Sequence, residues 1–296
     1  AFGIGNMVQA NSVAEPLLDT FGIPKLVTGI VIAVLCFAVI VGGVKRIGAF
    51  AAKIVPFMAA FYVLGALILI FTNLSGVPAA FAAIFEGAFS GTAATGGFIG
   101  AGVAQAIRFG VARGVFSNEA GLGSAPIAHG AAKTEEPVRE GLVAMLGPFI
   151  DTLVICTMTG LAIILTGAFA LKGADGSALT GSILTKTAFE NGIPFAGGGY
   201  IVTIGIVFFA FSTVIGWSYY GDRCIDYLFG QKAVLPYRII YCLIVPVGAT
   251  IKLSLVWLIS DIFNALMAIP NLIGLIFLSP IVLKLTKEYF SSPERV

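Results

Sequence analysis

The chain has 296 residues, of which 58% are apolar and 11% are charged, and its formal net charge at pH 7 is +2. Because a water-facing helix must present a polar side, this composition excludes a water-soluble globular domain. The small net charge says little about partners, and no nucleic-acid partner is expected. The apolar residues come in blocks about 20 long, which match the roughly 30 Å hydrocarbon core of a bilayer. The sequence therefore predicts an all-α fold, a polytopic transmembrane helical bundle.

In chain order, the expected spans cover about residues 1–18, 26–44, 54–73, 138–167, 198–221, 236–251 and 256–283. A Gly- and Ala-rich stretch from Ala79 to Ala132 is expected to cross once but discontinuously, and residues 178–191 to form a short surface helix. No segment is polar enough for a soluble domain, so residues 1–296 form a single transmembrane domain. The chain opens on Ala1-Phe2-Gly3 without an initiator Met or a basic n-region. This start favours an N-terminally truncated fragment, about the C-terminal two-thirds of a longer protein.

The distribution of Lys and Arg near the span ends predicts the orientation. Eleven such residues fall on one side of the expected spans, and four fall on the other, namely Lys25, Lys172, Lys186 and Lys252. Arg108 and Arg113 lie in the discontinuous stretch, are left out of this count, and look like part of the inner boundary. The richer side is therefore expected to be cytoplasmic, with the C-terminus inside a plasma or inner membrane.

Two Gly-rich clusters predict a broken helix within the discontinuous stretch. Gly96–Gly102 contains Gly97 and Gly100, and Ser117–Pro126 contains Asn118 and Glu119. Glycine costs about 1 kcal/mol per helix position relative to Ala, and unwound backbone at membrane depth is tolerated where it is buried or lines a cavity. Its freed N–H and C=O groups can then bind a substrate or an ion. The alternative is close helix packing through small residues.

Polar side chains in the first span suggest a ligand contact. Asn6 and Gln9 are three residues apart and share a helix face. An amide supplies both a donor and an acceptor, which suits a zwitterionic ligand. The competing interpretation is interhelical hydrogen bonding worth about 0.6 kcal/mol per contact.

A second polar cluster lies within residues 198–221. Ser212 and Thr213 are adjacent hydroxyls, a hard-oxygen environment suited to sodium, and Trp217 follows one turn later as the wall of a small pocket. Alternatively, the hydroxyls bond back to their own helix and Trp217 belongs to an interfacial belt.

Asp151 lies near the centre of its expected span, where a carboxylate is costly and must face a partner or a proton. It is therefore a candidate for ion coupling or gating, together with Asn118 and Glu119, and a purely structural buried pair is equally possible. Asp261 follows Ser260 near an expected outer end, as a helix cap would. Paired membrane aspartates would also suit an intramembrane aspartyl protease, although neither lies in a Gly-x-Gly-Asp context.

Three motifs resemble the alanine-or-glycine:cation symporter family: GNMVQANS at Gly5–Ser12, GVARGVFSNEAGLGSAP at Gly110–Pro126 and FSTVIGWSYYG at Phe211–Gly221. Gly43–Gly48 and Met267–Leu272 fit the same family. The resemblance covers essentially the whole chain, and the run through Asn118 and Glu119 is highly specific.

The resemblance implies a LeuT-type inverted-repeat fold and sodium-coupled import of alanine or glycine by alternating access. By the same resemblance, Gln9 contacts substrate, Trp217 is the aromatic wall beside Thr213, and Ser212 with Thr213 forms the sodium site. Gly96–Gly102 would belong to the broken helix that begins the second repeat. The family's first broken helix, with a Gly-Thr-Gly-Asn-type motif, would precede Ala1, so the site in this chain is expected to be incomplete.

The sequence therefore predicts a secondary active transporter of a small neutral amino acid rather than an enzyme. The alternatives are a fragment or subunit that does not transport by itself and, more remotely, the intramembrane protease. The sequence does not distinguish alanine from glycine, the D from the L enantiomer, or sodium from proton coupling. It also leaves the stoichiometry and the oligomeric state open.

Overall fold

A computed structural model describes residues 1–89, 103–173 and 176–291. The described chain is helical almost throughout, and its extended backbone pairing is confined to one isolated bridge, between Lys172 and Ala178. Five of its helical segments are long and apolar enough to cross a bilayer: Gly43–Thr72, Pro137–Leu165, Gly198–Phe229, Gln231–Thr250 and Leu253–Ser291. The chain is therefore a multi-pass membrane protein, as its composition predicts.

The helices that the structure describes in the first half of the chain are one long apolar helix, α3, and several shorter ones. In order these are η1 (Gly3–Met7), α1 (Val8–Phe21), α2 (Lys25–Ile40), α3 (Gly43–Thr72), η2 (Leu74–Gly76), α4 (Val77–Phe89), α5 (Val103–Asn118) and α6 (Ala125–His129). The segment between the expected spans 26–44 and 54–73 is helical and forms the first turns of α3. Ala, Lys and Arg are good helix formers, so the helix extends through its charged end.

The second half contains the other long helices. They are α7 (Pro137–Ala144), α8 (Leu146–Pro148), η4 (Phe149–Cys156), α9 (Thr157–Leu165), η5 (Ala168–Ala170), α10 (Gly181–Gly192), α11 (Gly198–Phe229), η6 (Gln231–Ala233), α12 (Val234–Thr250) and α13 (Leu253–Ser291). The expected short helix at residues 178–191 is present as α10, but it is not a surface helix, because Phe189 is buried in an apolar core. The expected span at residues 138–167 is also present, but its central eight residues form the π-helical segment η4.

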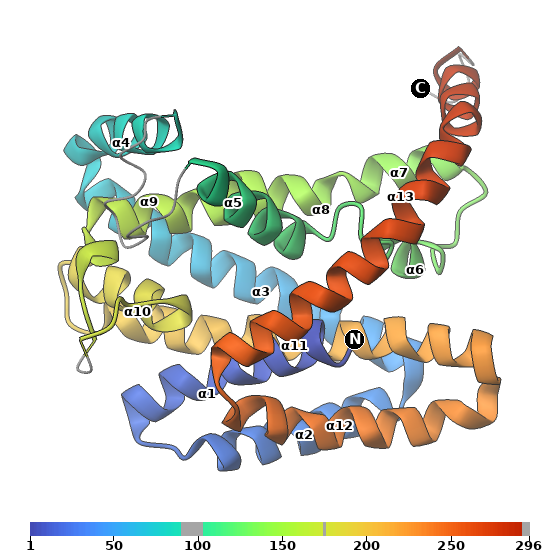
Figure 1. Ribbon diagram of the computed structural model, residues 1–296, viewed down its shortest axis with the longest axis horizontal. Coiled ribbons are helices and arrows are strands. Elements are labelled where there is room, and N and C mark those ends of the chain that lie inside the picture. The colour runs from blue at the N-terminus through green and yellow to red at the C-terminus, as the bar shows by residue number, and fades with distance from the viewer. Residues whose placement is uncertain (90–102, 174–175, 292–296) are drawn as a thin grey trace.

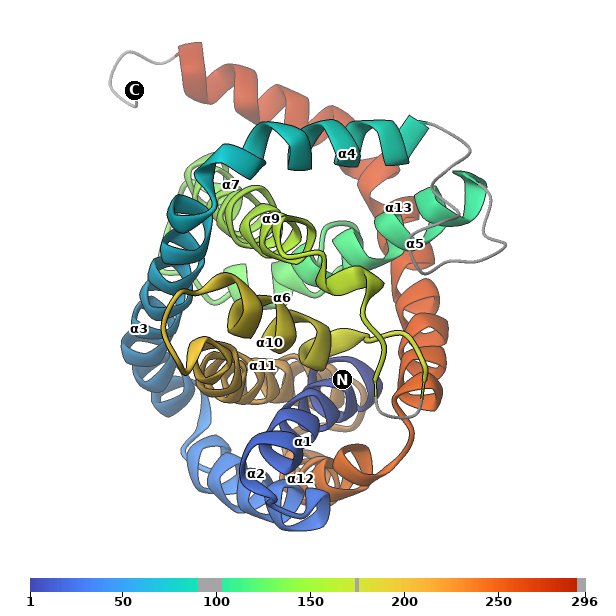
Figure 2. The same cartoon turned by 90° about the vertical axis from the view of Figure 1, so that its left-hand side faces the viewer.

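Helix α11 forms the middle of the bundle. It packs against α1, α3, α10 and α12, and Figure 2 shows it near the centre, with α1, α2 and α12 on one side and α9 on the other. One apolar core joins α1, α2, α11 and α12, and a second joins α3, α9, α10 and α11. Close approach of α2 to α12 requires Gly29, where an added Cβ would lie 2.6 Å from Pro246 Cα.

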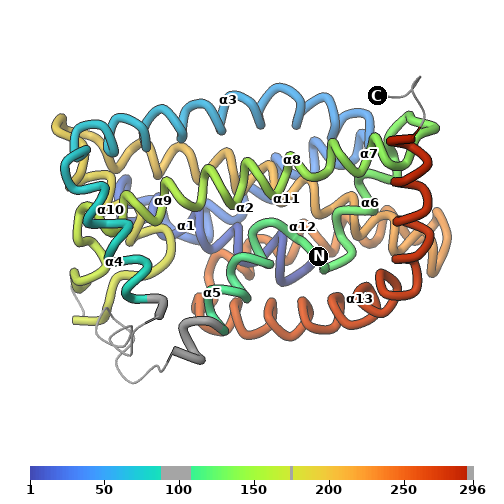
Figure 3. The backbone as a smooth tube through the Cα atoms, turned by 90° about the horizontal axis from the view of Figure 1, so that it is seen from above, coloured from blue at the N-terminus to red at the C-terminus, as the bar shows by residue number. Residues whose placement is uncertain are grey.

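Helix α13 crosses the front of the bundle diagonally (Figure 1). It buries Val256 and Ser260, whereas Ile276 and Phe277 remain 71% and 77% exposed, as expected for side chains that face lipid. Its C-terminal part turns away from the direction of its first part (Figure 3). Because α13 is oblique, the depth of its residues in the membrane does not follow from counting residues from the end of the span.

Candidate functional site

The first helix is unwound at two buried residues. Ile4 adopts extended backbone angles (φ −75°, ψ 139°) and Gly5 a left-handed conformation (φ 78°), although both lie within η1. A Cβ added at Gly5 would overlap the indole ring of Trp217 on α11, so only glycine fits there. The Tyr241 hydroxyl lies 2.8 Å from the carbonyl oxygens of both Gly5 and Val214, either of which can accept its proton. Main-chain groups are thus freed from a helix inside the bundle.

The second break confirms the prediction for Ser117–Pro126. Helix α5 ends at Asn118 and α6 begins at Ala125, and between them Glu119, Gly121 and Gly123 have positive φ angles. Leu122 anchors this break, because its buried side chain packs with Ile4 and Trp217. The two unwound segments of the chain therefore meet at Trp217.

Glu119 joins the second break to α11 through hydrogen bonds. Its Oε1 accepts a hydrogen bond from Trp217 Nε1 at 2.9 Å, and its Oε2 accepts one from Ser124 Oγ at 2.6 Å. Trp217 is 4% exposed and also meets the ring of Tyr220 edge-on, with the ring centroids 5.2 Å apart. The predicted aromatic wall is thus a fixed part of the interior.

A cavity of about 670 Å³ lies beside Trp217, on the side of Tyr220. Its lining residues come from the start of the chain, the second break, α6, α11, α12 and α13, and include Ser124, Trp217, Tyr220, Tyr237, Met267 and Asn271. The Tyr237 hydroxyl is buried without a hydrogen-bond partner in the described structure. This cavity is not lined by Gln9, Asn6 or Thr213, the residues predicted to share a pocket with Trp217. Trp217 instead lines it together with other residues.

Asp151 lies at the midpoint of Pro137–Leu165 and in the π-helical segment η4. Its Oδ2 accepts hydrogen bonds from Ser117 Oγ at 2.7 Å and Thr152 Oγ1 at 3.1 Å, and Asn118 Nδ2 donates to Thr152 Oγ1 at 3.1 Å. No Lys, Arg or His pairs with Asp151 within the described ranges. We call Ser117, Asn118, Asp151 and Thr152 the Asp151 cluster. It is an oxygen-rich group at membrane depth that lacks a basic side chain.

Ser212 and Thr213 bond back to their own helix. Their hydroxyls donate to Phe209 O at 2.9 and 2.8 Å, respectively. A hydroxyl that donates its proton still has lone pairs to offer a cation, so the pair can bind sodium only through those lone pairs. Both side chains are half-buried, between the core and the surface.

The two amides of the first helix differ in their surroundings. Asn6 is fully buried and its Nδ2 donates to Tyr241 O at 2.8 Å, which is an interhelical contact. Gln9 is half-buried. Asn6 Oδ1 and Gln9 Oε1 both lack a hydrogen-bond partner within the part of the chain that the structure describes. Gln9 thus has its amide oxygen available to a ligand, whereas Asn6 also ties η1 to α12. The predicted backbone contacts at Gly97 and Gly100 lie outside the described residues.

Arg113 and Asp261 form an ion pair between α5 and α13, and Arg113 also lies over the Trp257 ring, 4.0 Å from its centroid. This contact corrects two expectations. Asp261 is not a helix cap, because α13 begins eight residues earlier at Leu253. Arg113 and Asp261 do not lie at opposite boundaries of the membrane, because they are in contact. Helix α13 runs obliquely, and the stretch that contains Arg113 is not a straight span. Asp151 and Asp261 have different partners, so they do not form the pair that a protease requires.

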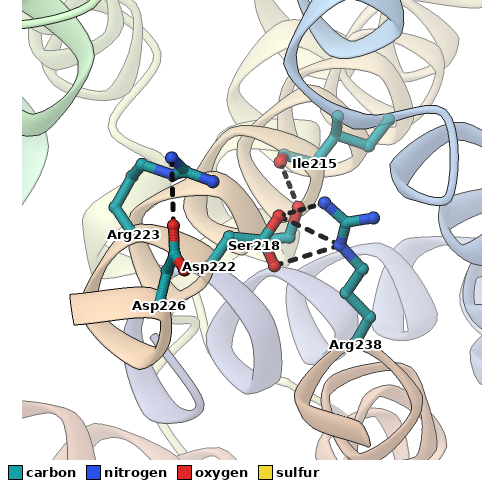
Figure 4. A network of polar contacts seen from close by, with 6 residues as sticks. All are labelled: Ile215, Ser218, Asp222, Arg223, Asp226 and Arg238. Carbon is teal, nitrogen blue, oxygen red and sulfur yellow. Dashed lines mark hydrogen bonds and ion pairs between the residues drawn. The ribbon is translucent and has the colours of Figure 1, made fainter. Parts of the chain in front are cut away.

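At one end of α11 a buried ion pair joins this helix to α12 (Figure 4). Arg238 Nε lies 3.1 and 3.0 Å from the two carboxylate oxygens of Asp222, and its Nη2 donates to Oδ2 at 2.7 Å. Asp222 is 1% exposed. A second pair, Arg223 with Asp226 at 3.4 Å, lies on the same helix. The bidentate contact between Arg238 and Asp222 fixes α12 against α11, the helix that carries Trp217.

The break at Ile4 and Gly5 and the contact of Tyr241 with Gly5 were not predicted from the sequence. A usable signal was present, because Gly3 and Gly5 flank one apolar residue directly before Asn6, just as glycines flank apolar residues in the cluster that was predicted to unwind. The partner of Gly5 could not be predicted, since Tyr241 lies 236 residues further along the chain.

Comparisons with known proteins cover the whole chain. A family model described as the sodium:alanine symporter family matches residues 1–295. The sodium/alanine symporter AgcS of Methanococcus maripaludis is 52% identical over 289 residues, which are 98% of this chain and 62% of that protein. An uncharacterized transporter of Haemophilus influenzae is 49% identical over 289 residues, 98% of this chain and 62% of that protein. The probable sodium/glutamine symporter GlnT of Bacillus subtilis is 38% identical over 291 residues, with 98% and 59% covered. The chain thus spans about three-fifths of the length of these relatives.

Proposed function

The chain belongs to the sodium:alanine symporter family, and on this premise we propose that it carries out sodium-coupled import of a small neutral amino acid, alanine or glycine. Import occurs by alternating access, with the substrate and sodium moving together down the sodium gradient. The names of its relatives support transport rather than enzymatic catalysis. The relative named for glutamine makes the size of the transported side chain the main question about the substrate.

One observation carries the proposal: the helix at Ile4 and Gly5 is unwound where it is fully buried, directly beneath Trp217. Backbone polar groups inside a bilayer must be satisfied, so unwound main chain at this depth requires partners from protein or ligand. Such main chain can hold the carboxylate and ammonium groups of an amino acid. Gln9, Asn6 and Thr213 provide the polar side-chain contacts in this proposal, and Trp217 limits the size of the ligand.

The coupling sodium has two candidate positions. Ser212 and Thr213 offer hydroxyl lone pairs on α11. The Asp151 cluster offers a carboxylate at the centre of a span, with hydroxyl donors but no basic partner among the described residues. A carboxylate at this depth needs a counter-charge. We therefore assign the coupling ion to the Asp151 cluster, whose Asn118 is the last residue of α5 before the second break.

The proposal includes the LeuT-type inverted-repeat fold, with Gly97 and Gly100 near its second broken helix. The excess of Lys and Arg on one side supports a cytoplasmic C-terminus in the cell membrane.

Uptake of radiolabelled alanine into proteoliposomes tests the function. We expect uptake that requires an inward sodium gradient, stops when choline replaces sodium, and is reduced by unlabelled glycine more than by glutamine. Uptake of equal rate in choline would contradict sodium coupling, and a stronger effect of glutamine would contradict the proposed substrate.

The ion assignment has its own test in Asp151→Asn, which removes the charge and keeps the shape. The expected result is a rise in the sodium concentration for half-maximal uptake of about tenfold or more, since one charge-assisted contact is worth roughly 1.5–3 kcal/mol. Glu86→Gln, at an exposed carboxylate of α4, is the matched control. An unchanged sodium dependence in Asp151→Asn would remove Asp151 from the coupling site.

A further inference from the structure

Trp217 is held from three directions, and one of these contacts is polar. The backbone of Gly5 lies against one face of the indole, the ring of Tyr220 meets it edge-on, and Glu119 accepts the Nε1 hydrogen bond. The first two are packing contacts. The hydrogen bond is directional, so Glu119 is the group that selects one orientation of the ring.

Glu119 is itself unusual in its backbone. It is the one non-Gly residue with a positive φ angle in the described ranges, at φ 57°. A residue in this region is destabilised relative to Gly and persists only where its surroundings hold it. Here the hydrogen bond from Ser124 Oγ and the buried side chain of Leu122 hold the segment. Glu119 is therefore placed rigidly at the junction of α5 with the second break.

The carboxylate of Glu119 is not used as an ion-pair partner by any described Lys, Arg or His. Its two oxygens instead accept from the Trp217 indole and from the hydroxyls of Ser124 and Tyr220, which are all neutral donors. A buried carboxylate that accepts only neutral donors is poorly compensated, so stability alone does not explain why a Glu stands here. Its hydrogen bond with the Trp217 indole, the proposed wall of the substrate pocket, does provide an explanation.

We propose that Glu119 is a positioning residue that fixes the orientation of Trp217 and thereby sets the largest side chain that the transporter accepts. This inference rests on the proposed function, in which Trp217 is the wall of the substrate pocket. Without the hydrogen bond the indole tilts on Tyr220 and the space beside it grows. Larger neutral amino acids then compete with alanine, so Glu119 determines specificity without touching the substrate.

The chain has two tryptophans, Trp217 and Trp257. In a Trp257→Phe background, fluorescence therefore reports on Trp217 alone. In this background Glu119→Ala removes the acceptor, and Glu119→Gln keeps an amide oxygen that accepts from the indole. If Glu119→Ala does not fold, Glu119→Leu of similar volume replaces it. Glu86→Ala, at an exposed carboxylate on α4, is the control.

We expect acrylamide quenching of Trp217 in purified protein to rise about twofold in Glu119→Ala, because loss of a directional hydrogen bond releases the ring. The quenching should stay at the background value in Glu119→Gln and Glu86→Ala. In proteoliposomes, leucine should inhibit alanine uptake by Glu119→Ala at a concentration about tenfold lower than for the background protein, and Glu119→Gln should restore the original selectivity.

Equal quenching in Glu119→Ala and the background protein would overturn the positioning role, and altered quenching with unchanged competition would overturn the role in specificity. A background protein that does not take up alanine would contradict the proposed function instead. The quenching comparison would then decide by itself whether Glu119 positions Trp217.

Discussion

Replacing Gly5 with Ala tests the contact on which the unwound segment depends. Two costs add at this position. Ala at a left-handed φ angle is destabilised by about 1 kcal/mol. Its Cβ also overlaps the Trp217 indole, and displacing the ring breaks the hydrogen bond to Glu119, which is worth about 1.5–3 kcal/mol because the acceptor is charged. We expect Gly5→Ala to lower the free energy of unfolding by about 2.5–4 kcal/mol.

Two other glycines separate these costs. Gly22 has a φ angle of 68°, and no atom lies within 4 Å of the position that a Cβ would take there, so Gly22→Ala carries the backbone cost alone, about 1 kcal/mol. Gly216 lies in α11 directly before Trp217 and has open space around it. Gly216→Ala should therefore be neutral or stabilise the protein by up to about 1 kcal/mol.

Unfolding in mixed detergent, followed by far-UV circular dichroism, measures the three variants against the unmodified protein. The expected order of stability is Gly216→Ala, then Gly22→Ala, then Gly5→Ala. If Gly5→Ala and Gly22→Ala lose equal stability, the close approach of Gly5 to Trp217 does not exist in the folded protein.

Two further predictions concern the helices that frame the site. Arg238→Met leaves the Asp222 carboxylate buried without its cation and should lower the free energy of unfolding by about 3–5 kcal/mol in the same assay. Adding Asp222→Leu should recover most of this loss. A double variant as unstable as the single one would contradict an ion-pair effect. Asn11 Nδ2 donates to Gly248 O at 3.1 Å and Ile251 O at 2.8 Å, so Asn11→Ala leaves carbonyls at the end of α12 unpaired and should cost about 2 kcal/mol. Ser279→Ala, on the exposed part of α13, is the control for Asn11→Ala, and equal stability of these two variants would refute the capping role.

The membrane helices and the break at Glu119–Ser124 could be predicted from the sequence because both depend on local chemistry. Long apolar runs require lipid, and Gly121, Gly123 and Pro126 do not favour a continuous helix. The limits of α3 were less accessible, since Lys45, Arg46 and Lys53 mark the end of a membrane span but do not end a helix. Helix formation and membrane insertion are separate properties, and charged side chains indicate where the membrane ends, not where the helix ends.

The partners across the site could not be predicted, because they depend on tertiary structure. Glu119 and Trp217 are 98 residues apart, and Arg113 and Asp261 are 148 apart. Counting residues along the sequence does not give depth in the membrane for the oblique helix α13 or for a broken segment. The break at Gly5 does not follow from the sequence, because two nearby glycines in an apolar run, Gly3 and Gly5, are equally compatible with close helix packing.

The entry of ²²Na⁺ into proteoliposomes shows directly whether sodium and amino acid cross the membrane together. If they do, external alanine should accelerate sodium entry, and Asp151→Asn should remove most of the acceleration while Glu86→Gln retains it. Sodium entry that does not change when alanine is added would contradict coupled transport by this protein.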